Sequence, residues 1–371
     1  MSSGTKRIQP AVWMAMVTLL AIVLVGLLNL RNAASYASET FHQTQVLWVV
    51  IGLLLAMAVS VIDLRFFERL SPVFYWGAVI FLLLVLFFGR ESHHARRWFD
   101  LGDIAFQPSE FAKPALVLFL ARYFHGERSP ERYTLRTLLK PMGYVAIPAV
   151  LILLEPDLGT TLVLIAVGFS IMFFEGVRLR SFIKLMGIIA LVVPMAWHFN
   201  IIKPYQKERV RVWMDMATSE PQARKKLDKG MQPEQALWAV GSGRITGKGS
   251  MQGVQSRLKY LPEMHTDFII ATYAEERGFV GCVALLLLYL GLIVSLLMVA
   301  VQAKERFAVL VSVGAVAIIL WQVVFNMGMV LGLLPVVGLT LPFMSYGGSA
   351  TISAMFAVGL ALNAGIHKGQ V

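Results

Sequence analysis

Apolar runs long enough to cross a lipid bilayer recur along the whole chain, and they limit its fold more than any other feature. About ten candidate spans can be assigned, at residues 10–30, 45–62, 72–89, 108–125, 141–155, 157–175, 181–199, 279–302, 307–330 and 346–366. Segments in hydrocarbon must satisfy their own backbone hydrogen bonds, so spans of this kind are helices. We therefore expect an all-α polytopic membrane protein in which residues 1–371 form a single transmembrane domain.

Lys and Arg are distributed unevenly between the short loops. If the N-terminus is cytoplasmic, most of these residues fall in cytoplasmic loops, and the short outer loops hold only Arg31, Arg90, Arg96 and Arg97. The positive-inside rule then predicts that both termini are cytoplasmic. Segment 200–278, between spans seven and eight, is expected to be a large extracytoplasmic loop, because long loops cross the membrane largely regardless of charge.

Composition narrows the possible partners and the redox chemistry. The formal net charge is +11 at pH 7, which suits anionic lipid or a phosphate-bearing substrate. The basic residues are scattered over loops between spans, so nucleic acid is disfavoured. Cys282 is the single cysteine, and the chain can form no internal disulfide.

Two basic stretches of the long loop have two readings each. "KPYQKERVRVW" (203–213) contains Lys203, Arg209 and Arg211, which could lie on an amphipathic surface helix or bind a phosphate or pyrophosphate. "GSGRITGKGS" (241–250) contains Lys248 and resembles a P-loop, but Ser and Gly replace required residues at its two ends. A nucleotide-hydrolysing function therefore has almost no support, and the second reading of this stretch is a flexible glycine-rich loop whose backbone amides approach a ligand.

Polar residues also lie at the ends of predicted spans. Pro108 is well placed to open a helix, on which Glu110 and Lys113 would share one face and could form an internal ion pair. Asp157 follows Glu155-Pro156 in a tight break between two spans and could cap the next helix. Seven Gly and Pro residues interrupt segment 326–350, which predicts non-helical backbone at the outer membrane edge.

"YLPEMHTDFIIATYAEERGFVG" (260–281) places four titratable residues beside an apolar run: His265, Asp267, Glu275 and Glu276. Asp267 is the best candidate for a general base, because partial burial would raise the pKa of its carboxyl toward the working range. Its alternative role is to cap a helix that begins at Phe268. The two glutamates could support the site or simply pair with nearby bases.

Five ordered motifs together resemble one family. "RRWFDLGDIAFQPSEFAK", "EPDLGTTLV", "GSGRITGKG", "LPEMHTDFIIATYAEERGFVG" and "LLPVVGLTLPFMSYGGSA" are similar to the motifs of the RodA/FtsW family of shape, elongation, division and sporulation proteins. The resemblance implies a peptidoglycan glycosyltransferase in the bacterial cytoplasmic (inner) membrane. Such an enzyme polymerises lipid II at the outer face, beside a class B penicillin-binding protein and other elongation-complex proteins. The motifs look closer to RodA than to FtsW.

The chemistry implied by this resemblance suggests roles for specific residues. Extending a glycan on a lipid carrier requires a general base for the attacking sugar hydroxyl and cations that stabilise the departing pyrophosphate. The base would be Asp267, and the substrate-binding candidates are Lys203, Arg209, Arg211, Lys248, Arg96, Arg97, His265 and Ser345. A divalent cation, Mg²⁺ or Mn²⁺, could assist, although no ligand cluster demands one.

One segment departs from the family pattern. Family members carry a motif close to Gly-Tyr-His…Gln-Ser…Ala-Ile-Gly-Ser-Gly before the glycine loop, where this chain has "GMQPEQALWAVGSGR". Gln235 stands in for part of that motif, and the Tyr and Ser are absent. The family's substrate contacts are therefore not carried over to segment 221–240. Two rival functions stay open: a lipid II transporter, for which charges near membrane spans are typical, and a non-catalytic scaffold for a transpeptidase.

Overall fold

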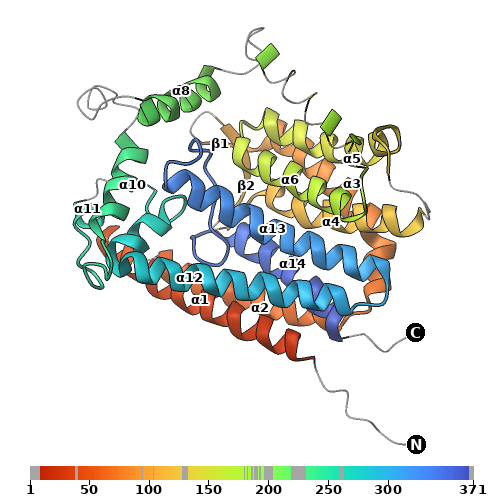
Figure 1. Cartoon of the computed structure of the whole chain (residues 1–371), viewed down its shortest axis with the longest axis horizontal. Helices are drawn as coiled ribbons and strands as arrows, with labels where there is room; N and C mark the ends of the chain where they lie inside the picture. The colour runs from red at the N-terminus through yellow and green to blue at the C-terminus, as the bar shows by residue number, and fades with distance from the viewer. Residues whose placement is uncertain are drawn as a thin grey trace, which may run out of the picture.

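The structure is a computed structural model. It describes residues 9–37, 41–92, 95–102, 104–127, 133–178, 204–218, 231–258 and 263–366, together with single residues between 180 and 195. Long helices run side by side through the molecule, and shorter elements gather at one end of the bundle, where α10 and α11 lie (Figure 1). The start of α1 and the end of α14 lie toward the other end (Figure 1).

Seven of the described helices are long and apolar enough to cross a membrane. They are α1 (Pro10–Ala37), α2 (Phe41–Val61), α3 (Leu64–Phe88), α5 (Leu135–Leu154), α12 (Ile269–Gln302), α13 (Arg306–Val330) and α14 (Gly348–Ile366). Two more helices coincide with predicted spans, α4 (Pro108–Gly126) and the shorter α6 (Leu158–Phe174). The predicted fold class, an all-α polytopic membrane protein, is confirmed. Most of the predicted span 181–199 lies outside the described residues.

The boundary of α5 shows where hydropathy alone gives the wrong start. The helix begins at Leu135, before the predicted residue 141. The backbone N–H of Thr134 donates to Thr137 Oγ1 over 2.9 Å at this end, so a polar cap starts the helix ahead of its apolar part. By contrast, α4 opens at Pro108 as predicted.

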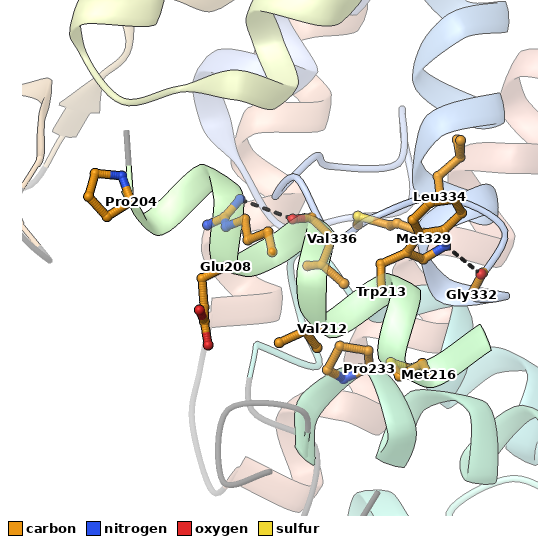
Figure 2. Close-up of a pocket in the computed structure, with 11 residues that line it drawn as sticks. Pro204, Glu208, Val212, Trp213, Met216, Pro233, Met329, Gly332, Leu334 and Val336 are labelled. Carbon is orange, nitrogen blue, oxygen red and sulfur yellow. Dashed lines mark hydrogen bonds between the residues drawn. The ribbon is translucent and has the colours of Figure 1, made fainter. Parts of the chain in front are cut away.

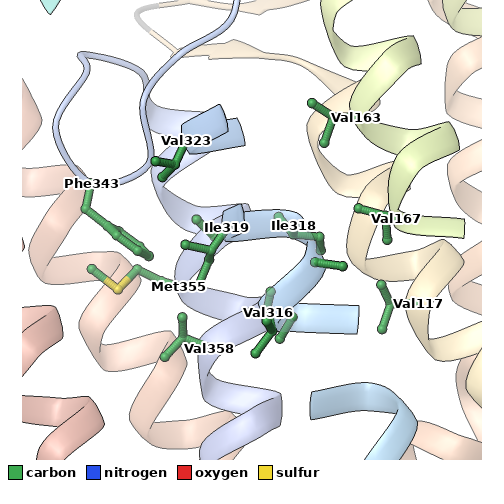
Figure 3. Packing of buried hydrophobic residues seen from close by; sticks show 14 of the residues in the cluster. Val117, Val163, Val167, Val316, Ile318, Ile319, Val323, Phe343, Met355 and Val358 are labelled. Atoms are coloured by element: carbon green, nitrogen blue, oxygen red, sulfur yellow. The ribbon is translucent and has the colours of Figure 1, made fainter. Parts of the chain in front are cut away.

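Helix α13 forms the centre of the bundle, and most of its side chains are buried. Val316, Ile318, Ile319 and Val323 of this helix lie among apolar side chains of α4, α6 and α14 (Figure 3). The neighbouring side chains drawn there are mostly β-branched, and the stiffness of such side chains favours close and regular packing. The α13 side chains thus fix the spacing between the neighbouring helices, which carry the polar residues.

Helix α12 contains a sharp kink that the hydropathy pattern does not reveal. Gly278 has φ 65° and ψ −165° inside the helix, a conformation that only glycine adopts at low cost. The backbone N–H groups of Lys248 and Gly249 donate to the carbonyls of Glu275 (3.1 Å) and Glu276 (3.0 Å) just before the kink. The glycine-rich loop therefore uses these amides to hold a bent helix, and not to cradle a phosphate.

A small antiparallel sheet lies between α3 and α4 and was not predicted. Its strands are β1 (Arg90–Ser92), β2 (Ala95–Leu101) and β3 (Ile104–Phe106), in the order β1-β2-β3. All three strands are short, and β1 and β2 are rich in charge, so the segment lacks the apolar alternation by which a half-buried strand is recognised. The sheet carries the "RRW" motif to the end of the bundle.

Further short elements cover the same end. They are α8 (Pro204–Thr218), α10 (Met231–Ser242) and α11 (Val254–Arg257). Segment 203–213 is thus helical from Pro204 onward, and a helix is compatible with both readings of this segment. Residues 331–347, between α13 and α14, are non-helical, which confirms the predicted non-helical backbone for most of segment 326–350; its two ends belong to α13 and α14.

Candidate functional site

A cavity of about 620 Å³ opens at the end of the bundle that carries the sheet and α8. Its wall is built from the start of α2, strands β1 and β2, the starts of α4 and α6, Arg209 of α8, the turn 263–267, and segment 337–350. Asp267, Glu110, Asp157, Arg97, Arg209 and His265 all line it. Six residues selected from four separate motifs therefore meet in one space.

Asp267 lies in the turn that precedes α12, on the cavity wall. Burial raises the pKa of Asp267 to about 6, the negative charges of Glu263 and Asp157 add to the increase, and Arg209 and Arg97 oppose it. An aspartate with such a pKa is ionised at neutral pH and is still a stronger base than an exposed carboxylate.

The backbone around Asp267 fixes the position of this side chain. Asn326 Nδ2 donates to the Asp267 carbonyl over 3.0 Å. A Cβ atom on Gly338 would lie 3.2 Å from Asp267 Oδ2, and Gly338 has φ 72°. Glycine at this position thus allows the 331–347 segment to turn directly against the carboxylate.

The alternative role of Asp267 as a helix cap is wrong. Helix α12 begins at Ile269, its N-cap position is Phe268, and no side-chain hydrogen bond caps this end. The carboxylate of Asp267 is therefore not engaged in starting the helix and faces the cavity.

Two arginines bring positive charge to the same wall. Arg97, on β2, donates from Nε to the Glu155 carbonyl over 2.9 Å and from Nη2 to the Pro156 carbonyl. Arg209, on α8, donates from Nη1 to the Val336 carbonyl over 3.1 Å. Both guanidinium groups lower the pKa of Asp267 electrostatically. They lie in one cavity with the carboxylate although segments far apart in the sequence carry them.

Asp157 has the structural role expected for it. Its carboxylate accepts hydrogen bonds from Thr160 N (3.1 Å) and Thr160 Oγ1 (2.9 Å) and so caps α6. Gln107 Nε2 donates to the same carboxylate over 3.2 Å. With three donors bound, Asp157 stabilises the cavity wall.

The ion pair expected on α4 is present. Lys113 Nζ lies 2.8 Å from Glu110 Oε2, and both side chains are almost fully buried. Ser353 of α14 donates to the Glu110 carbonyl over 2.7 Å. Removing either partner would leave a buried charge unpaired.

Glu275 and Glu276 are buried in the first part of α12 and hold the glycine loop. Glu275 Oε1 accepts from Lys248 Nζ over 2.7 Å, and Glu276 Oε2 accepts from Asn32 Nδ2 over 2.6 Å. Glu276 Oε1 also accepts from the N–H of Met251 over 3.0 Å. The structure thus separates these glutamates and Lys248 from the cavity that contains Asp267.

The remaining candidates have varied positions. His265 lines the cavity and stacks on Phe41 with ring centroids 4.6 Å apart. Ser345 is buried and donates from Oγ to the Thr266 carbonyl over 2.6 Å, so it positions the turn beside Asp267. Arg96 and Arg211 are exposed. Lys203 and residues 221–230 lie outside the described residues, and Gln235 is buried on α10.

Sequence reasoning missed several residues of the cavity wall. Trp48 of α2, Trp98 of β2 and Tyr346 add aromatic surface, and Glu263 adds a second carboxylate beside Asp267. Trp98 belongs to a quoted motif, but only the sheet brings it to the cavity. In the described part of the chain, no group of three or more His, Cys, Asp or Glu residues is arranged to hold a metal ion.

A second pocket, of about 500 Å³, lies under α8 and is lined mainly by apolar residues. Val212, Trp213 and Met216 of α8 face Met329, Leu334 and Val336 across it (Figure 2). Arg209 lines both this pocket and the cavity. The two spaces are therefore neighbours that share one basic residue.

Comparison with known proteins agrees with this architecture. Residues 6–370 match the sequence profile of the cell cycle proteins FtsW, RodA and SpoVE. The peptidoglycan glycosyltransferase MrdB of Escherichia coli K12 is 37% identical over 320 residues, which are 86% of this chain and 84% of MrdB. A probable peptidoglycan glycosyltransferase FtsW of Nitrosomonas europaea is 34% identical over 372 residues, covering 96% of this chain and 93% of its own length.

Solved structures show the same fold. A peptidoglycan synthase complex, described as coordinating polymerization and crosslinking, contains a chain that matches with a TM-score of 0.81 at 33% identity, covering 97% of this chain and 98% of that one. The rod shape determining protein RodA of Thermus thermophilus matches with a TM-score of 0.71 at 31% identity over the same shares. On the profile, the identities and the shared fold, this chain belongs to the FtsW/RodA/SpoVE family of cell cycle proteins.

Proposed function

We propose that this chain is a peptidoglycan glycosyltransferase of the RodA type, which polymerises lipid II into glycan strands during cell elongation. The observation that carries the proposal is the cavity in which Asp267, with its raised pKa, lies with Arg97 and Arg209. A base and cations in one partly enclosed space are the parts that glycosyl transfer from a lipid pyrophosphate requires.

The reaction can be written with these residues. The Asp267 carboxylate takes the proton from a sugar hydroxyl while the hydroxyl oxygen forms a bond to the anomeric carbon of the second substrate. The bond from that carbon to the pyrophosphate oxygen breaks, and its electron pair leaves on the pyrophosphate. Arg97 and Arg209 stabilise the charge that develops there, because a guanidinium group can bind phosphate through two parallel hydrogen bonds.

Orientation in the membrane follows from the same proposal. Lipid II polymerisation at the outer face requires the cavity end of the bundle, with α8 and the sheet, to be extracytoplasmic and both termini to be cytoplasmic. The positive-inside distribution of Lys and Arg supports this orientation. A reporter fused at Lys304, between α12 and α13, should then be cytoplasmic, and one inserted in segment 219–230 should be external.

The partner is a class B penicillin-binding protein, which would cross-link the strands made here. The solved synthase complex that shares this fold coordinates polymerization and crosslinking, and this supports the assignment. The deciding experiment incubates the purified protein, alone and with its transpeptidase, with labelled lipid II and measures glycan polymer. Transfer of lipid II across proteoliposome membranes without any polymer would contradict the proposal and favour a transporter.

A further inference from the structure

The apolar pocket beneath α8 has no role in the chemistry described so far. It is about 500 Å³ in volume, within the range of roughly 300 to 1,000 Å³ that is typical of small-molecule sites. Its walls come from α8, the end of α13 and the 332–336 segment, with Val212, Trp213, Met216, Leu334 and Val336 facing the interior (Figure 2). A surface of this kind suits a hydrocarbon ligand.

Two hydrogen bonds hold the walls of the pocket together. Trp213 Nε1 donates to the Gly332 carbonyl over 2.9 Å, and Arg209 Nη1 donates to the Val336 carbonyl over 3.1 Å. Both polar groups bind backbone at the rim, so the space between α8 and the segment is built into the fold. The side chain of Glu208 points away from the apolar side chains (Figure 2).

Arg209 connects this pocket to the polar cavity. The residue lines both spaces, and Val336 of the pocket is followed in the chain by Val337 of the cavity. On one side of Arg209 lie Asp267 and Arg97, and on the other lie apolar side chains. A ligand that fits both sides is amphipathic, with an anionic head at Arg209 and a hydrocarbon chain that starts directly behind it.

We propose that the pocket under α8 binds the phosphate-proximal isoprene units of a lipid-linked pyrophosphate substrate, with Arg209 holding the pyrophosphate at the junction. The inference rests on the proposed function, because that function supplies a pyrophosphate joined to an isoprenoid. Only the first units of a long carrier occupy the pocket, and the rest of the chain extends into the membrane. Their binding energy would orient the reacting sugar toward Asp267.

Matched tryptophan substitutions test the proposal on both walls. Met216→Trp and Leu334→Trp fill the pocket from α8 and from the facing segment. Their controls are Met214→Trp and Leu333→Trp, which change the same residue types nearby at positions whose side chains are 52% and 67% exposed. Arg209→Gln removes the charge at the junction.

The measurement is the affinity of each full-length variant, in lipid nanodiscs, for geranylgeranyl pyrophosphate and for inorganic pyrophosphate. The pocket-filling variants should bind geranylgeranyl pyrophosphate about tenfold more weakly than their controls, the scale expected when one or two methylene groups lose buried contacts. Their affinity for inorganic pyrophosphate should not change. Arg209→Gln should lower the affinity for both probes.

Several results would overturn the inference. Wild-type protein that binds geranylgeranyl pyrophosphate no more tightly than inorganic pyrophosphate has no isoprenoid site, and equal affinities in filled and control variants would place the site elsewhere. If one filling variant fails to fold, the pair on the other wall decides the result. Protein that binds the isoprenyl probe as expected but makes no polymer from labelled lipid II would contradict the proposed function alone and leave the pocket assignment standing.

Discussion

Lys248 Nζ lies 2.7 Å from Glu275 Oε1, next to the kink of α12 and away from the cavity that contains Asp267. The same carboxylate accepts from the backbone N–H groups of Gln255 (3.0 Å) and Ser256 (3.2 Å). Glu275 is fully buried, so its charge depends on these donors. The pair therefore holds the glycine loop, although the sequence equally permitted Lys248 to bind phosphate.

We expect Lys248→Met to weaken folding rather than substrate use. Removing the ammonium leaves a buried carboxylate without its cation, which should lower the free energy of unfolding by about 2 kcal/mol or more. Apparent melting temperature in detergent measures this loss. Folded Lys248→Met should keep its KM for lipid II, whereas Arg97→Gln and Arg209→Gln should raise KM at unchanged yield. A raised KM in Lys248→Met of normal melting temperature would return this lysine to the site.

The Glu110–Lys113 pair gives a separate prediction about stability. Glu110→Gln or Lys113→Met alone leaves one buried charge unpaired and should cost about 3 to 5 kcal/mol. The double variant should recover part of that loss, with a coupling of at least about 1 kcal/mol. The four proteins are compared by melting temperature and folded yield. Strictly additive effects would show that the 2.8 Å contact does not stabilise the bundle.

Much of the helical framework could be predicted because hydropathy and helix geometry are local properties. The tight break at Glu155-Pro156 and the start of α4 at Pro108 both follow from single residues. The kink at Gly278 could not be found in this way. Its cause is a set of contacts with the 243–249 loop, which lies about 30 residues earlier in the chain, and hydropathy carries no information about such contacts.

The kinds of residue in the candidate site could be predicted from the sequence, but not which residues of each kind lie there. A carboxylate and several bases were expected in the long loop, and Asp267 and Arg209 do share a cavity. Arg97 was among the candidates, but nothing in its neighbourhood predicted the sheet that carries it to the cavity. Lys248 and Arg211 have the same charge as Arg209, so composition could not separate them. Tertiary position made that distinction.

The pH dependence of polymerisation should report the titration of Asp267. Burial raises the pKa of this carboxyl to about 6, so the base form is lost as the pH falls through 6 and gained as it rises. We expect kcat/KM to increase with pH and to level off about one unit above that pKa. Rates of polymer formation between pH 5 and 8 measure the profile.

Two neighbouring charges should move that profile in opposite directions. Glu263 raises the pKa of Asp267 and Arg209 lowers it. Glu263→Gln should therefore shift the midpoint to lower pH, and Arg209→Gln should shift it to higher pH. A midpoint that stays constant in both variants would mean that another group controls the reaction.

The most direct test of the base is Asp267→Asn. The substitution keeps the shape of the side chain beside Gly338 but removes its basicity, so polymerisation should fall by roughly 10²-fold or more, the scale for loss of a positioned general base. Folding should not suffer, because Asp267 caps no helix and the change also removes repulsion from Glu263 and Asp157. The variant should retain the wild-type melting temperature and its affinity for geranylgeranyl pyrophosphate, and its residual activity should lose the rise near pH 6. Labelled lipid II, with the transpeptidase present, gives the rate. Near wild-type polymerisation by folded Asp267→Asn would remove this residue from the mechanism, and Glu263 would then be the next carboxylate in the cavity to test.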